Sequence, residues 1–301
     1  MKKQVTALTK RNMKLFYKDK GTFFTSLATP MILMVLYATF LYKIYEDSFR
    51  AGVPEGVLFP GDTLKGLVGG LLLSSLLSVS AVTVSFCANL CMVADKYTGA
   101  KGDISIAPVK PRTMAFSYYF STVMNGLIIS MVATAIGCVY LCFVGWYLSL
   151  GDILLFLLDV FVLVLFGTAL SSVVAYPLTT QGQLSAAGSI ISSGYGFICG
   201  AYMPISSFSE GLRNVLSFFP GTYGTSLLRN HALRGVFAEL EAQQFPADAI
   251  ESIKTVADCN IQFLGNNLEI WQMYLGLIVA TALLVGGYVL LNVLSEKRKT
   301  K

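Results

Sequence analysis

The chain has 301 residues, of which 54% are hydrophobic and only 13% are Asp, Glu, Lys or Arg. Soluble domains carry about 25% charged residues, so the composition excludes a water-soluble globule, as well as disordered, collagen-like and disulfide-scaffold chains. The net charge of +5 comes without a basic patch interleaved with aromatic residues, so it does not indicate nucleic-acid binding. We expect a protein embedded in a lipid bilayer.

Six apolar runs bounded by charged residues predict membrane-spanning helices, because a helix needs about 20 apolar residues to cross the hydrocarbon. None of them alternates in the manner of a membrane β-barrel strand. We therefore expect an all-α integral membrane protein, a six-helix bundle that forms one domain over residues 1–301. The six runs are residues 23–42, 67–94, 114–144, 153–176, 186–202 and 270–294.

The distribution of basic residues predicts how the bundle is oriented. With six spans, both ends of the chain share one side of the membrane, and that side receives 15 of the 22 Lys and Arg residues. Loops rich in Lys and Arg stay in the cytoplasm. We therefore expect both termini to be cytoplasmic.

The first 22 residues are basic and precede the first span, without the cleavage pattern of a signal peptide. In a helix, Val5, Leu8 and Phe16 fall near one face, while Lys10 and Lys14 occupy others. This pattern favours an amphipathic helix lying in the membrane interface; a frayed basic tail is the alternative.

Residues 203–269, on the outer side, are much longer than a turn. Two apolar patches, at 212–219 and 223–228, are too short to cross the bilayer. We interpret them as re-entrant half-helices whose ends other parts of the protein must cover. A surface helix, broken near Pro246, is expected over residues 237–256.

Reactive groups that could form an enzyme site are scarce. His231 is the only histidine, and we expect it in a surface or loop position near the outer leaflet. No catalytic residues and no metal site are predicted, because histidine pairs and nucleophile–base constellations cannot form. Five of the six cysteines fall in predicted spans, where packing is the expected role, and Cys259 alone is expected outside them without a partner.

A few polar residues inside the predicted spans are candidates for a substrate path. Asp159 is the only deep acidic residue and should face the bundle or a wet cavity, where it either serves substrate or makes a structural hydrogen bond. Ser75 and Ser78 in the second span either bond neighbouring helices or line a polar route.

Small residues recur at every fourth position along the fifth predicted span. They are Gly188, Ser192, Gly196 and Gly200. Such stripes let helix backbones approach closely in lipid, so we expect a tight helix contact, either within the bundle or across a dimer axis.

The inner loop over residues 95–113 combines a polar start with a small apolar face. Pro108 and Pro111 break helix there, and Ile104, Ile106 and Ala107 provide the apolar side chains. A short helix with such a face is typical of helix-in-groove recognition by a soluble partner.

This loop resembles the inner loop of ABC-type-2 exporter permeases, in which it forms the coupling helix. The resemblance rests on the pair Asp95–Lys96, on Gly99, and on Ala107–Pro108 with a basic residue nearby. Residues 200–204, 219–223 and 228–229 are similar to that family's segment after the fifth span, although Gly102 stands where many members have an acidic residue. The resemblance assigns contact with the ATPase to Tyr97, Thr98, Gly99, Asp103, Ile104, Ala107 and Pro108.

The resemblance implies that the chain is a permease subunit in a bacterial plasma membrane and is not itself an enzyme. The chain has no phosphate-loop motif, so the chain itself would bind no cofactor, and ATP and Mg would be bound by a separate ABC ATPase, present in two copies. The permease would pair with itself or with a sister permease. The apolar spans favour an amphiphilic or hydrophobic substrate, such as a drug, a lipid-like natural product or a glycan carrier, exported by alternating access.

Two other classes of membrane protein compete with this interpretation. An ion-coupled secondary transporter or channel would require an inverted repeat or several intramembrane ionisable groups. A membrane enzyme would require a catalytic cluster that a lone His231 cannot supply.

Overall fold

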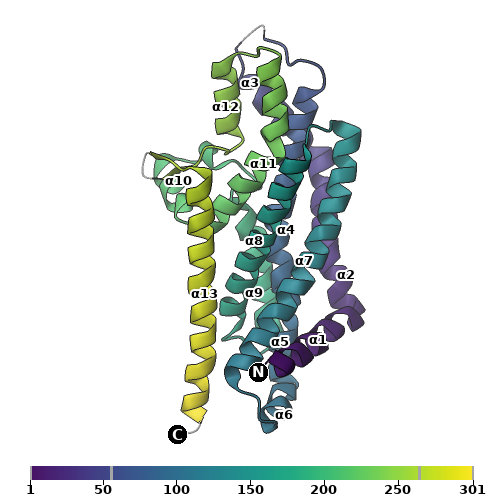
Figure 1. The fold of residues 1–301 in the computed structure, drawn as a ribbon, viewed down its shortest axis with the longest axis vertical. Helices are drawn as coiled ribbons and strands as arrows, with labels where there is room; N and C mark the ends of the chain where they lie inside the picture. The colour runs from purple at the N-terminus through teal and green to yellow at the C-terminus, as the bar shows by residue number, and fades with distance from the viewer. Residues whose placement is uncertain (1, 55–56, 264–265, 300–301) are drawn as a thin grey trace.

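The helix α4 (Thr63–Ala88) runs through the centre of the molecule in the computed structural model (Figure 1). The structure describes residues 2–54, 57–263 and 266–299. Residue 1 of the expected interface helix, residues 264–265 of the expected outer segment, and Lys301 lie outside this description.

Around α4 pack α2 (Lys20–Leu36), α7 (Pro111–Val144), α8 (Leu150–Ala175) and α11 (Pro220–Ala242). The apolar section of α4 is buried on every side, as expected for a helix that is hydrophobic all round. Glycine permits close approaches between these helices: a Cβ atom on Gly70 would lie 2.7 Å from Cδ2 of Leu233. The all-α prediction is confirmed, apart from a short hairpin of β1 (Gln262–Phe263) and β2 (Asn266–Asn267).

Five described helical segments are long and apolar enough to span a membrane, compared with six runs in the sequence. The first joins α2, the π-helix η1 (Tyr37–Leu41) and α3 (Tyr42–Ala51), and the second joins α4 and α5 (Leu90–Tyr97). The others are α7, α8 and residues Ile270–Leu294 of α13 (Ile270–Lys299). The fifth expected span corresponds to α9 (Gln181–Ile198), whose 18 residues include two glutamines and several serines, and it is not among the five.

Both ends of the described chain lie at the same end of the bundle as α6 (Ala100–Ile106), which we call the α6 end (Figure 1). At this end, α1 (Lys2–Lys18) occupies the segment expected to form an interface helix. It lies against α7, where the Thr9 hydroxyl donates to the Ser117 carbonyl at 3.4 Å, and it buries Asn12 and Phe16.

The expected outer segment differs from the prediction in its helix lengths. After the 3-10 helix η2 (Ile205–Ser207), the apolar patch at 212–219 overlaps the short helix α10 (Glu210–Ser217). Residues 223–228, however, are not a separate half-helix, because they belong to the 23-residue α11, which packs on α4, α8 and α13. The expected break at Pro246 is present: α11 ends at Ala242 and α12 (Ala247–Val256) starts after the proline.

Candidate functional site

The corner between α5 and α6 lies at the tip of the α6 end, near the level reached by the end of α13 (Figure 1). Gly99, at the N-cap of α6, has φ +84°, a left-handed conformation that glycine adopts without steric cost. It follows Tyr97 and Thr98 directly, so it lets α5 end and a new helix begin.

The helix α6 buries none of its side chains completely. Ile106 is 85% exposed, and Asp103 and Ala107 are exposed as well. Ile104 alone packs back on the apolar cluster between α5 and α7. Pro108 follows, and its carbonyl accepts a hydrogen bond from the Gln4 side chain at 3.3 Å. An apolar side chain as exposed as Ile106 on a protruding helix is typical of a contact surface.

The corner is anchored to α1 and α7 through Asp95, the last acidic residue of α5. Its carboxylate forms a bidentate ion pair with the Arg11 guanidinium on α1, with Nη2 and Oδ1 2.9 Å apart. The Tyr118 hydroxyl on α7 donates to Oδ2 of the same carboxylate at 2.6 Å. Bidentate, charge-assisted contacts of this kind fix geometry as well as adding energy, so α1, α5 and α7 are joined rigidly here.

A second anchor joins the corner to α8. The Lys96 ammonium donates to three carbonyl oxygens at the end of α8, those of Ala175 at 3.3 Å, Leu178 at 2.9 Å and Tyr176. Carbonyls at the end of a helix have no partner within it, so a lysine that donates to them stabilises both elements. Asp95 and Lys96 thus bond the α5–α6 corner to α1, α7 and the end of α8. Sequence reasoning had noted Asp95–Lys96 as a motif but not these partners.

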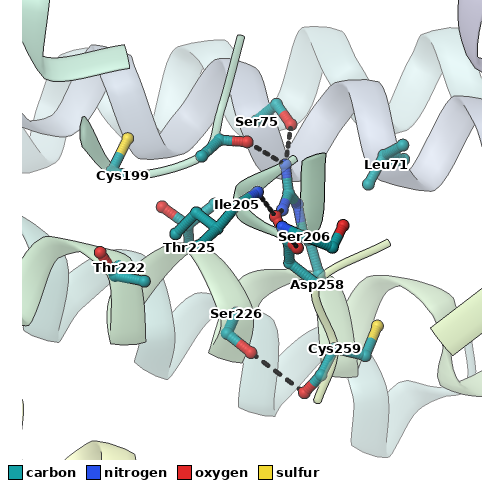
Figure 2. A network of polar contacts seen from close by, with 12 residues as sticks. Leu71, Ser75, Cys199, Ile205, Ser206, Thr222, Thr225, Ser226, Asp258 and Cys259 are labelled. Carbon is teal, nitrogen blue, oxygen red and sulfur yellow. Dashed lines mark hydrogen bonds and ion pairs between the residues drawn. The ribbon is translucent and has the colours of Figure 1, made fainter. Parts of the chain in front are cut away.

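A buried polar network lies between α4, α11 and the chain after α9 (Figure 2). Ser75 of α4, one of the substrate-path candidates, accepts from the fully buried Arg229 guanidinium at 3.2 Å. Ser78, the other serine candidate, bonds the Thr225 hydroxyl of α11 and lies 3.6 Å from Sγ of Cys199. Both serines therefore bond neighbouring elements, the first of the two roles considered from the sequence.

Asp159 faces the interior of the bundle and has partners on two other helices. Its Oδ2 lies 2.6 Å from Nδ1 of His231 on α11, and its Oδ1 accepts from the Tyr274 hydroxyl on α13. The expectation of a surface position for His231 is wrong, since its side chain is buried in this cluster. The reason is that α11 continues into the core, whereas the sequence suggested a short outer half-helix ending before residue 231.

The stripe of small residues on α9 divides into two parts. A Cβ atom on Gly196 would collide with the Tyr202 ring, and Gly200 is buried with φ +77°, so both are required by the turn that follows α9. A Cβ on Gly188 would meet nothing, and the side chain of Ser192 lies outside the description. Within this chain, the small residues of α9 therefore permit a close contact with the turn that follows α9.

Cys259, which was expected outside the spans without a partner, is buried beside this network, and burial raises the pKa of its thiol to about 12. Its carbonyl accepts from the Ser226 hydroxyl at 3.1 Å. All six cysteines are free.

A groove of about 1040 Å³ opens between two walls on the side of the bundle. One wall is formed by α2, η1 and α3, with Phe40 and Ile44 among its side chains. The other is formed by Phe197 of α9 and by residues 202–204 and 206–207. The lining is mostly apolar, and it is the largest of the described cavities that we identified.

Comparison with known protein families identifies the family of this chain. A family model described as ABC-2 type transporter matches residues 3–232, which include all but the first residue of α1, the α5–α6 corner and the first half of α11. No match to a curated protein was found. Because the family model covers well over half of the chain, the protein belongs to the ABC-2 type transporter family, whose members are transmembrane permeases.

Proposed function

We propose that the chain is the transmembrane permease subunit of an ATP-driven exporter, powered by a separate ABC ATPase. The observation that carries this proposal is the exposed helix α6, which is anchored to three other helices through Asp95 and Lys96. An ATPase that holds Ile106 and moves on nucleotide binding would pull on α1, α7 and α8 together. ATP and Mg would be bound by the ATPase.

We further propose an assembly of two permease bundles and two ATPases in a bacterial plasma membrane. In this arrangement α9 is the sixth crossing, since 18 helical residues span about 27 Å at 1.5 Å per residue. Six crossings put both termini on the ATPase side, in agreement with their position at the α6 end (Figure 1). The basic residues of α1 support the same orientation.

The substrate is proposed to be amphiphilic or hydrophobic and to use the groove between the α2–α3 wall and the α9 wall. The support is its size and its apolar lining. Asp159, Ser75 and Ser78 are assigned structural hydrogen bonds instead, because their polar atoms already bond neighbouring helices.

The test is reconstitution of the chain with its ATPase in vesicles, followed by export of a panel of amphiphiles. We expect export that requires ATP and stops when the phosphate-loop lysine of the ATPase is substituted. Vesicles with the ATPase alone are the control. Export by the permease alone, driven by an ion gradient, would contradict the proposal and favour a secondary transporter.

A further inference from the structure

The chain between α9 and η2 is held by a buried ion pair from two distant segments. Arg229 of α11 is fully buried, and its Nη1 lies 2.9 Å from Oδ2 of Asp258. Its Nη2 donates to the Gly200 carbonyl at 2.6 Å, immediately after α9, and to Ser75. One guanidinium thus connects α11, α4, the end of α9 and the segment after α12.

Asp258 holds the other end of the same turn. Its carboxylate accepts from the backbone N–H groups of Ile205 at 2.6 Å and Ser206 at 3.1 Å, the first residues of η2. Figure 2 shows Ile205, Ser206 and Asp258 grouped together beneath Ser75. The backbone of Asp258 has φ +48°, a conformation that non-glycine residues rarely adopt. Residues 200–207 are therefore fixed at both ends by one ion pair.

The turn fixed in this way forms a wall of the groove. Tyr202, Met203 and Pro204 line the groove from the turn, opposite α2 and α3. The Tyr45 hydroxyl of α3 donates to the Tyr202 carbonyl at 3.4 Å, which connects the two walls. Neither Arg229 nor Asp258 lines the groove, yet both determine where this wall stands.

Stability alone does not account for a charge pair at this position. Buried ion pairs can often be replaced by apolar residues of similar volume without loss of stability, because desolvation offsets their attraction. Here the pair also leaves Nε of Arg229 without a hydrogen-bond partner among the described residues. What the pair does supply is a set of directional bonds to both ends of the turn.

We propose that Arg229 and Asp258 are positioning residues for substrate binding: they hold the 200–207 turn as a rigid wall against which an amphiphile packs. This inference rests on the proposed function. Breaking the pair leaves the α6 end untouched but lets the turn move, so substrate binding weakens while the connection to the ATPase persists.

The experiment measures amphiphile-stimulated ATP hydrolysis by the complete permease–ATPase assembly in nanodiscs. The variant Asp258→Asn keeps the size of the side chain but replaces the carboxylate with an uncharged amide. One of the two acceptor oxygens is thereby replaced by an NH2 group, which faces the N–H donors of Arg229 and η2. We expect the half-saturating amphiphile concentration to rise by about fivefold or more, and basal hydrolysis to stay within about twofold, which separates binding from turnover. Glu46→Gln, which removes the exposed Arg50–Glu46 pair on α3, is the matched control and should change neither value.

Arg229→Lys is the second variant, because it keeps the charge but cannot form the fork that reaches both Gly200 and Asp258. Arg229→Lys should also raise the half-saturating amphiphile concentration. An unchanged concentration in both variants, or an equal fall of basal and stimulated hydrolysis, overturns the inference, as does failure of both variants to assemble. If the unsubstituted assembly shows no stimulation by any amphiphile, the proposed function itself is wrong.

Discussion

The ion pair between Arg11 and Asp95 should determine how tightly α1 is held at the α5–α6 corner, and Asp95→Asn tests this. The substitution removes a carboxylate that is 6% exposed and accepts from Arg11 and Tyr118. Hydrogen bonds to a charged group contribute about 1.5–3 kcal/mol. The Arg11 side chain is 33% exposed and regains contact with water when the pair is lost. We therefore take the cost of the substitution as about 2 kcal/mol, near the lower end of that range. This corresponds to roughly a 30-fold shift towards undocked α1.

Two measurements report the effect. Hydrogen exchange of the α1 amides should accelerate by about tenfold or more, since exchange follows local opening. The amount of amphiphile exported per ATP should fall, because α1 no longer follows α6. Tyr118→Phe removes only one hydrogen bond, so its effect should be smaller, about 1 kcal/mol.

The control is Asp62→Asn, which removes the exposed Lys65–Asp62 pair and should change neither measurement. Our interpretation of the anchor is refuted if Asp95→Asn leaves both the exchange of α1 and the transport ratio unchanged. It is also refuted if Tyr118→Phe has the same effect as Asp95→Asn, since the charge would then be unimportant.

Three further predictions concern single side chains. Ile106→Asp places a charge on the exposed face of α6 and should weaken copurification of the ATPase by about tenfold or more. Thermal stability should not fall, because the side chain is on the surface. Unchanged association would disprove the contact between Ile106 and the ATPase. Lys96→Met leaves three carbonyls at the end of α8 without their donor, so the free energy of unfolding should drop by about 2 kcal/mol, and an unaltered unfolding midpoint would argue against this anchor. Burial raises the pKa of Cys259 to about 12, whereas an unfolded thiol titrates near 8.5. The folded chain therefore keeps a proton that the unfolded chain loses, and stability should fall by up to about 1.4 kcal/mol per pH unit between about pH 9 and 11; a stability difference from Cys259→Ala that does not vary with pH would contradict this.

The features that the sequence predicted well are those that depend on a contiguous run of residues. Hydropathy summed over a run gave the all-α class and five of the long apolar helices, and proline placed the break between α11 and α12. The sequence analysis also counted the region of α9 as a span, but this helix contains two glutamines and several serines and is not among the five. The prolines and the apolar side chains of the 95–113 loop predicted a short helix there, and α6 occupies residues Ala100–Ile106 of that loop.

The partners of the buried polar groups could be assigned only from the tertiary structure. Asp159 and His231 are 72 positions apart, and Arg11 and Asp95 are 84 apart. Which of these side chains meet depends on the rotation of each helix about its axis and on which helices are neighbours. Neither property can be inferred from one contiguous run of residues. A charged residue within an apolar stretch, such as Arg229, signals that a partner is required. Only the packed fold shows that the partner is Asp258, because it joins two segments that have no common local pattern.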